Sequence, residues 1–364
     1  MNDLERFYAC LNYEQRDRPA FWECEWGAWP ETIQRWKGEG FRPGIDNPGR
    51  DCDQRDVQSR WFFPHPPFAS KLVAEDESTV LRINEEGILM RERKDNPHSS
   101  MPQFVKFPVE SRQEFRTFWR QRMQPDLAER IGPNWQQELP RLRRTDRPFL
   151  VWADRWGGFF GPLRNLVGVE RLCELFYDDP AWVEEMMEAD ADFIIAIMAQ
   201  VLDVVKVDCF SFWEDMAYKT APLISPEMAR QYLLPRYRRV VDFLVSRGVP
   251  FIALDSDGQI DPLIPVWLDA GINALYPFEV QAGMDVRAVR GKYGKNLRMW
   301  GGVDKRALAH GPAAIDAELA RLKPLIEEGG YIPQTDHSIP PDVSFQNYRY
   351  YLERLKAICA VEAA

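Results

Sequence analysis

Residues 250–276 read PFIALDSDGQIDPLIPVWLDAGINALY, and the order of patterns in this stretch indicates the architecture. Pro250–Leu254 and Ile272–Tyr276 are short apolar runs of the kind that form buried strands. A helical pattern lies between them and ends at Gly271. A strand, a helix and a second strand within so short a stretch predict two parallel strands joined by a crossover helix.

The same alternation continues on both sides of this unit. The other strand-like runs are Phe149–Ala153, Val207–Trp213, Leu297–Trp300 and Tyr331–Pro333. The helices expected from capping residues, initial prolines or terminal glycines are Pro180–Val204, the segment from Ser225 to Gly248, Pro312–Glu328 and Ser344–Ile358. Repeated alternation of strand and helix predicts an α/β fold with right-handed crossovers.

The expected fold is a single (β/α)8 barrel of the TIM type, distorted, in one domain over residues 1–364. The alternative is an open, doubly wound sheet that binds a dinucleotide, and it requires a G-x-G-x-x-G turn after an early strand. The glycine pair Gly157-Gly158 lacks that spacing, and no P-loop pattern occurs. We therefore favour the barrel, with its regular β/α repeats in residues 149–364.

Residues 1–148 are less regular and are interpreted as an N-terminal extension of the barrel. Ala20–Trp26 is expected to form the first barrel strand, and Asn47–Ser59 is expected to be a polar loop. Thr79–Ile83 and Ile88–Arg93 alternate in polarity around a glycine-containing turn, which predicts a β-hairpin insertion.

The composition narrows the class of protein. The chain has 364 residues, of which 45% are hydrophobic and 28% charged, as in ordinary globular proteins. A net charge of −10 repels a phosphate backbone, so nucleic acid is not expected as a partner. No apolar run is long enough to span a membrane, and no secretory signal is recognised at the N-terminus. Six scattered cysteines, with no CxxC, predict a reduced, cytoplasmic protein.

Acidic residues follow nearly every expected strand, where a barrel of this type places its active site. Capping of the following helices explains part of this pattern. The clearest local signal is Asp336-His337 after the last strand, because a histidine there can donate a proton or bind a metal. The candidate catalytic residues are His337, Asp257 and Asp336.

Aromatic residues gather at the same strand ends. Beside the acids, they predict a pocket with aromatic walls, a few polar groups and a small-molecule substrate. Arg155, Arg164 and Lys219 are the cations available to an anionic ligand. The candidate substrate-binding residues are Trp22, Glu23, Trp152, Arg155, Trp156, Trp213, Glu214 and Tyr218.

Four motifs together resemble the uroporphyrinogen decarboxylase superfamily, which includes corrinoid-dependent methyltransferases. The motifs are Asp215–Tyr237 (DMAYKTAPLISPEMARQYLLPRY), Asp255–Gly258 (DSDG), Met299–Leu308 (MWGGVDKRAL) and Gly330–Tyr348 (GYIPQTDHSIPPDVSFQNY). The resemblance covers about residues 149–360 and, more loosely, the whole chain. It implies a distorted (β/α)8 barrel and an enzyme.

The resemblance leaves the branch open. Uroporphyrinogen decarboxylases have an arginine-rich motif near the N-terminus, whereas Arg18–Trp26 (RPAFWECEW) carries acids and tryptophans. His337 falls where the decarboxylases have a histidine. The methyltransferases bind zinc through His-x-Cys and a later Cys, and here Asp255-x-Asp257 matches the first pair, with Asp336 or His337 near the second position. The resemblance thus implies either a metal site of Asp255, Asp257 and His337 for Zn²⁺, Mn²⁺ or Mg²⁺, or no metal.

Three functions follow as hypotheses. The first is a methyltransferase that moves a methyl group between a small aromatic or amine compound and a corrinoid protein or a folate. The second is a decarboxylase, a carboxy-lyase without cofactor, in which Asp257 or Asp336 stabilises a cation and His337 donates the proton. The third is a non-catalytic barrel that binds a small molecule. A homodimer is a further expectation.

Overall fold

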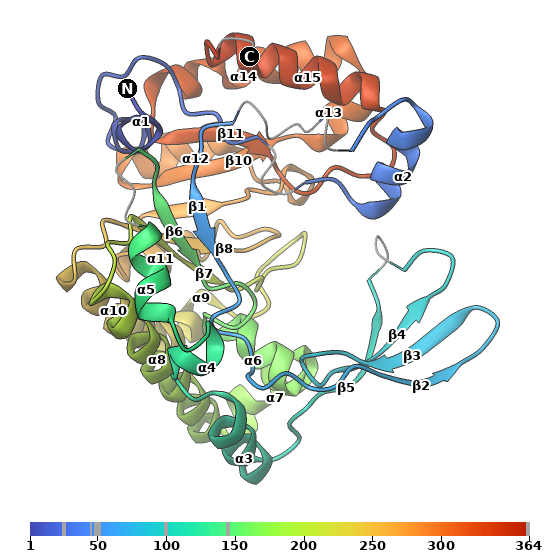
Figure 1. Cartoon of the computed structure of the whole chain (residues 1–364), viewed down its shortest axis with the longest axis vertical. Helices are drawn as coiled ribbons and strands as arrows, with labels where there is room; N and C mark the ends of the chain where they lie inside the picture. Colours follow the sequence, from blue (N-terminus) through green and yellow to red (C-terminus); the bar gives the residue numbers. More distant parts are fainter. Residues whose placement is uncertain (24–26, 44–45, 47–51, 98–100, 143–145, 362–364) are drawn as a thin grey trace.

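The computed structural model of the chain describes residues 1–364 except 24–26, 44–45, 47–51, 98–100, 143–145 and 362–364. Its centre is one curled sheet of seven strands in the order β1-β6-β7-β8-β9-β10-β11 (Figure 1). The strands are β1 (Asp56–Gln58), β6 (Phe149–Trp152), β7 (Cys209–Trp213), β8 (Phe251–Asp255), β9 (Ala274–Tyr276), β10 (Arg298–Val303) and β11 (Tyr331–Thr335). The six strands predicted between residues 149 and 335 are thus confirmed.

All neighbouring strands of this sheet run parallel, so their carboxyl ends meet at one edge, called here the barrel mouth. The register places Trp213 of β7 beside Asp255 of β8, and Asp255 beside Tyr276 of β9. The residues that follow these strands therefore begin at nearly the same level.

Helices cover the convex face of the sheet. Between the strands lie α6 (Phe160–Val167), α7 (Val169–Asp178), α8 (Pro180–Leu202), α9 (Pro226–Met228), α10 (Leu234–Ser246), α11 (Ile264–Asp269), α12 (Val286–Tyr293), α13 (Lys305–His310) and α14 (Pro312–Glu328), and α15 (Phe345–Ile358) follows the last strand. Asp179 and Ser344 cap two of these helices: their side chains accept N–H groups of the first turns of α8 and α15. The helix predicted from Ser225 is divided into α9, a π turn at Ala229–Leu233 and α10.

The N-terminal part contributes α1 (Asp3–Leu11), α2 (Pro30–Gly38), α3 (Arg112–Arg122), α4 (Leu127–Arg130) and α5 (Trp135–Glu138). Short 3-10 turns occur at Leu139–Leu142, Val280–Ala282 and Gly294–Asn296. Within the described ranges, no helix has the length and apolar character needed to cross a bilayer.

The alternation of side chains along the strands divides the core into two parts. One set of strand residues packs under the helices, whereas the other forms a separate cluster on the concave side with Phe7 and Trp22. In this second cluster the Trp22 ring stacks on Phe7 at 5.2 Å, and Trp300 stacks on Tyr276 at 4.7 Å between ring centroids. The interior of the curled sheet is therefore filled by large rings.

The predicted first strand, Ala20–Trp26, is not formed over residues 20–23, and residues 24–26 lie outside the described part. The first strand is instead β1, inside the segment 47–59 predicted as a polar loop. Side chains make part of the contacts of residues 21–23: Asp53 Oδ2 accepts the Phe21 N–H at 2.9 Å, and Glu23 Oε2 accepts the Thr335 N–H at 2.8 Å. The Asp53 N–H also donates to the Phe21 carbonyl oxygen at 2.9 Å. Because these bonds replace a strand ladder, no eighth strand closes the sheet between β1 and β11 in the described chain.

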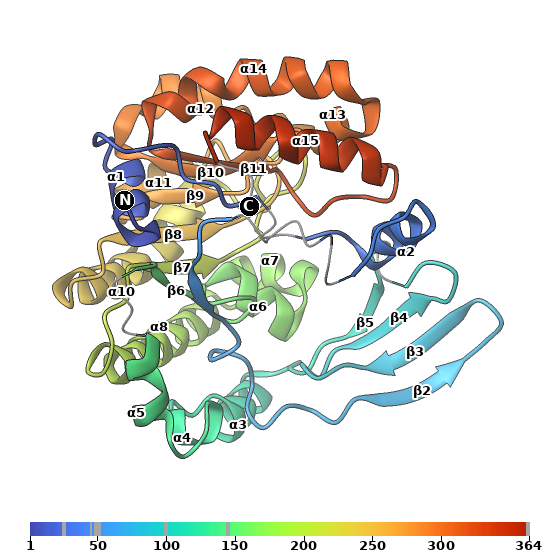
Figure 2. The same ribbon diagram turned by 45° about the horizontal axis from the view of Figure 1, so that its top comes forward.

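The predicted hairpin is confirmed as β3 (Thr79–Ile83) and β4 (Leu89–Arg93), but it belongs to a larger antiparallel sheet. The outer strands, β2 (Lys71–Glu75) and β5 (Gln103–Lys106), were missed because every residue in them is exposed, so neither has an alternating pattern. This inserted sheet projects away from the barrel on the side of α2 (Figures 1 and 2).

Candidate active site at the barrel mouth

Asp257 and His337 face one another at the mouth, after β8 and β11. His337 Nε2 lies 3.5 Å from Asp257 Oδ2, and each side chain is 34% exposed. Burial lowers the pKa of His337, but the hydrogen bond and the charge of Asp257 outweigh it and raise the pKa above its usual value. The Trp29 ring lies 6.1 Å from the imidazole. This pair can hold a proton and present it to a bound molecule.

Asp215 and Arg164 form a second pair beside the first. The guanidinium contacts the Asp215 carboxylate and donates to the Asp215 carbonyl oxygen at 2.7 Å. Asp215 has a φ of 45°, a left-handed conformation that non-glycine residues rarely adopt. Burial raises the pKa of Asp215, Arg164 lowers it, and the nearby charge of Asp257 raises it. The charges of Asp215 and Asp257 therefore lie close enough to influence one another at the mouth.

Glu214 lies behind this pair and fixes the start of α6. It is fully buried, and its oxygens accept the backbone N–H groups of Phe159, Phe160 and Gly161 at 2.6–2.8 Å, together with the Tyr237 hydroxyl. A carboxylate at a helix N-terminus satisfies donors that have no partner within the helix. Since Arg164 lies on α6, Glu214 holds that guanidinium against Asp215.

Asp336 is also fully buried, and it joins three loops beneath His337. Its oxygens accept the N–H groups of Val280 at 2.9 Å and Lys305 at 3.1 Å, and Lys305 Nζ lies 3.6 Å away. Burial raises the pKa of Asp336, although Lys305 and the two N–H donors lower it. This residue orders the loops on which Glu279 and His337 lie.

Glu86 of the inserted sheet contacts the loop after β6 at the mouth. Trp156 Nε1 donates to Glu86 Oε2 at 2.8 Å, and Arg155 Nη2 lies 3.4 Å from Glu86 Oε1. Asp154, between them and β6, has its pKa raised to about 6, chiefly by burial. The charge of Arg155 lowers that value and the charge of Glu86 raises it.

The other predicted substrate-binding residues are divided between the mouth and the core. Trp213 lies at the mouth, with the Arg164 guanidinium 5.0 Å from its ring centroid, and Tyr218 is 61% exposed. Trp152 is half-buried at the end of β6. Trp22 lies in the concave cluster, and Trp156 is buried against Phe118. Glu23 is buried and accepts the Tyr351 hydroxyl at 2.7 Å, besides its bonds to Thr335.

The donors expected for a metal do not converge. Asp255 is buried as the last residue of β8, and its carbonyl oxygen accepts the Glu214 N–H at 2.9 Å. Over the described ranges, no three histidine, cysteine or acidic side chains are grouped as metal ligands. The His337 nitrogen nearest Asp257 is committed to that carboxylate. The residues present therefore do not form the three-donor site.

Four residues of the mouth were given no role from the sequence: Trp29, Glu86, Asp154 and Asp215. Asp154 and Asp215 are nevertheless among the acids that follow the expected strands, and Trp29 is among the aromatic residues near them. Asp215 could have been found, because neighbouring residues at a strand end point to opposite sides and Glu214 occupies the helix side. Nothing in the local sequence around Glu86 indicates its position, since the turn that carries it reaches the mouth only through tertiary packing.

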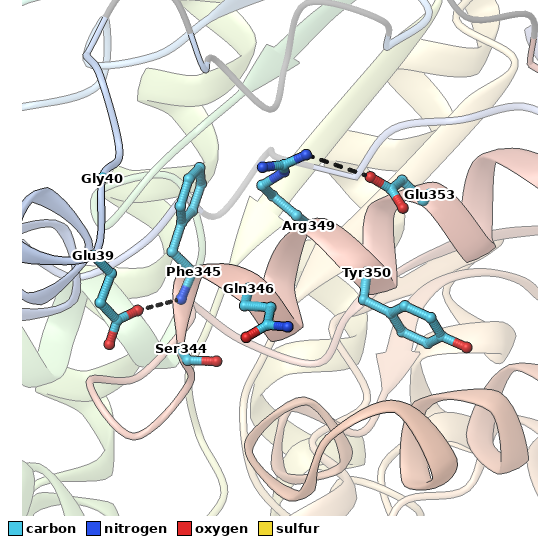
Figure 3. A pocket seen from close by; sticks show the side chains of 8 residues that line it. All are labelled: Glu39, Gly40, Ser344, Phe345, Gln346, Arg349, Tyr350 and Glu353. Atoms are coloured by element: carbon cyan, nitrogen blue, oxygen red, sulfur yellow. Dashed lines mark hydrogen bonds and ion pairs between the residues drawn. The ribbon is translucent and has the colours of Figure 1, made fainter.

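A groove of about 630 Å³ lies away from the mouth, between the end of α2 and the start of α15 (Figure 3). Its carboxylates are engaged: Glu39 accepts the Phe345 N–H at 2.7 Å, and Glu353 lies 3.8 Å from Arg349. Its lining has no histidine or cysteine. We therefore place the candidate active site at the mouth, where titratable groups of several strands converge, and not in this groove.

Comparisons with known proteins concern the family and the fold of the chain. The model of the uroporphyrinogen decarboxylase (URO-D) family matches residues 157–358, more than half of the chain. A uroporphyrinogen decarboxylase from Ectopseudomonas mendocina is 24% identical over 197 residues, which cover 51% of this chain and 51% of that protein. The match thus spans about half the length of this curated relative.

Two solved structures extend the comparison. A methyltransferase from Methanosarcina mazei matches over 96% of both chains, with a TM-score of 0.61 and 15% identity. A B12-independent methionine synthase from Shewanella sp. W3-18-1 covers 75% of this chain and 74% of its own, with 12% identity and a TM-score of 0.41, too low to support a conclusion. At 15% identity, the first of these matches shows the fold alone.

Proposed function

The chain belongs to the uroporphyrinogen decarboxylase family, and from that premise we propose that it is an enzyme of the methyltransferase-like branch. It would move a methyl group between a small aromatic or amine compound and a corrinoid protein or a folate. The observation that carries this proposal is the charge balance of the mouth. Three of the cations there are each paired with acids of the chain: Arg155 with Glu86, Arg164 with Asp215, and Lys305 with Asp336.

This balance disfavours a polyanionic substrate. A carboxylate-rich tetrapyrrole would have to displace the resident acids from these cations, in a partly buried site where charge repulsion is strong. A neutral or cationic methyl donor meets no such penalty. The aromatic rings of Trp29 and Trp213 supply apolar and π surfaces beside the acids, as a small amine or aromatic compound requires.

The residues of the mouth suit the departure of a demethylated leaving group. As the methyl carbon passes to the nucleophile of the carrier, the bond from that carbon to the donor heteroatom breaks and its electrons stay on the heteroatom. His337, protonated and held by Asp257, donates its proton to that atom. Asp215 and Arg164 orient the donor, and Asp336 and Glu214 keep their loops and helix in place.

The test is methyl transfer to cob(I)alamin and to tetrahydrofolate, with a panel of methylated amines and methoxylated aromatic compounds. We expect formation of methylcobalamin or methyltetrahydrofolate, and loss of most of this activity in His337→Ala. His310→Ala is the matched control, because His310 is exposed on α13 and bonds only its own helix at Arg306. Absence of transfer to both acceptors across the panel would remove the proposal.

A second candidate function is decarboxylation, which the URO-D match over residues 157–358 favours. In that reaction His337 would protonate the carbon that loses carbon dioxide. Incubation with uroporphyrinogen under reducing conditions decides it: a changed porphyrin profile supports the decarboxylase, and an unchanged profile removes it. If ligand binding survives in both His337→Ala and Asp257→Ala and no chemistry is found, the non-catalytic binding barrel is favoured.

A further inference from the structure

The inserted sheet is anchored to the barrel at one end only. At its inner end, beside the turn between β3 and β4, Glu86 is 7% and Ile88 is 1% exposed, whereas β2 and β5 are exposed along their whole length. Gly87 has a φ of 86° and lies against Phe68, so closely that a Cβ there would come within 2.8 Å of that ring. The turn is therefore held in one position.

A row of stacked aromatic rings connects this turn to the mouth. Phe68 stacks on Phe118 of α3 with ring centroids 6.1 Å apart, and Phe118 stacks on Trp156 at 5.9 Å. Trp156 follows β6 directly, beside Asp154 and Arg155. The backbone N–H of Phe68 also donates to the Glu85 carbonyl oxygen at 2.9 Å. The turn, α3 and the loop after β6 are thus packed as one unit.

Glu86 is the polar end of that unit. One carboxylate oxygen accepts the Trp156 indole N–H at 2.8 Å, and the other lies 3.4 Å from the Arg155 guanidinium. Arg155 has a φ of 56°, and its guanidinium lies 5.9 Å from the centroid of the Trp213 ring. We propose that Glu86 is a positioning residue of the mouth: it holds Arg155 and Trp156 in place and sets the charge next to Asp154.

The charges around Asp154 support this role. Burial raises the pKa of Asp154 to about 6, Arg155 and Arg60 lower it, and Glu86 raises it. Arg60 in turn pairs with Glu85 of the same turn, at 3.1 Å. The inserted sheet therefore contributes Glu86, one of the three charges that act on this acid at the end of β6. On this proposal the inserted sheet forms one wall of the active site and is not a separate domain.

The inference rests on the proposed function only in taking the mouth as the active site, so its test does not depend on turnover. In Glu86→Gln the amide oxygen can still accept the Trp156 N–H, but the charge beside Arg155 and Asp154 is gone. We measure the titration of the Asp154 carboxyl by ¹³C NMR, with its signal assigned from Asp154→Asn. The control is Glu75→Gln on β2, since Glu75 pairs with Lys94 in the same sheet but away from the mouth.

We expect Asp154 to titrate at lower pH in Glu86→Gln than in the wild type, and to be unchanged in Glu75→Gln. Arg155→Met tests the same contact from the other side and should shift the titration to higher pH, which keeps the test valid if Glu86→Gln does not fold. Where turnover is found, KM in Glu86→Gln should rise by a factor of about two to five, as for loss of a partly exposed ion pair. An Asp154 titration that moves in neither variant would overturn the proposal, whichever reaction the enzyme catalyses.

Discussion

Replacing Glu214 by glutamine has two opposite effects on the stability of the protein: it removes a buried carboxyl whose ionisation is unfavourable, and it weakens the hydrogen bonds to the start of α6. Burial raises the pKa of Glu214 to about 7, although the hydrogen bonds from Tyr237 and three backbone N–H groups lower it. An ordinary glutamate titrates near 4.5, so over the range between these values the folded chain keeps a proton that the unfolded chain has released. The stability that comes from this proton is fully present below about pH 4.5 and is lost as the pH rises through about 7.

The magnitude follows from the same two values. A difference between 4.5 and about 7, at about 1.4 kcal/mol per pH unit, corresponds to roughly 3 kcal/mol of stability lost between about pH 4 and pH 8. In Glu214→Gln this dependence disappears, because an amide does not titrate. The variant is also less stable than the wild type at low pH by about 1–3 kcal/mol, since its amide NH₂ faces backbone N–H donors of α6.

Urea unfolding at about pH 5 and about pH 8 measures both effects. We expect the stability difference between wild type and Glu214→Gln to be smaller, or reversed, at the higher pH. Glu353→Gln is the control, because Glu353 is exposed on α15 and pairs only with Arg349 at 3.8 Å. A difference that is equal at the two pH values would mean that the four donors keep Glu214 ionised throughout, and the reasoning from burial would be wrong.

Three further predictions concern the mouth and the core behind it. Asp190 of α8 is fully buried, and neither of its oxygens has a hydrogen-bond partner in the described chain. Burial raises its pKa, so the wild type should lose stability as the pH rises above about 4. In Asp190→Asn this loss should be absent, which urea unfolding at several pH values measures. Gly158→Ala should lower the free energy of unfolding by about 3 kcal/mol, because its Cβ would lie 2.2 Å from the Trp213 carbonyl oxygen. Gly291→Ala on α12, with open space around it, should raise the free energy of unfolding by up to about 1 kcal/mol, and calorimetry measures both. Asp257→Asn should lower the pKa of His337 in an NMR titration, because burial and Lys305 lower it and the charge of Glu279 then remains to raise it; an unchanged pKa would mean that Asp257 does not act on His337.

The strands from β6 to β11 could be predicted because each is an apolar run buried on both faces, and such runs are visible without knowledge of their neighbours. The position of the site followed from their parallel order. β1 could not be predicted, since its sequence is Asp-Val-Gln and only its pairing with β6 makes it a strand.

The sequence also could not predict which acids face the candidate site and which hold loops or helices in place. Glu214 and Asp215 are adjacent and chemically alike, yet one binds the N-terminus of α6 and the other faces Asp257. Asp336 is a catalytic candidate from the sequence because it precedes His337, and in the structure both of its oxygens accept loop N–H groups. Which acid faces the ligand depends on packing, and that information lies in residues far along the chain.

The segment at residues 21–23, which lies between β1 and β11, has a consequence for synthesis of the protein. Glu23 bonds Thr335, 312 residues later, and Tyr351, 328 residues later. At roughly 5–20 residues per second, the ribosome needs about 15–60 seconds to deliver the first of these partners. Throughout that interval Glu23 lacks both partners, so the contacts that join it to β11 and α15 form only near the end of synthesis or after it.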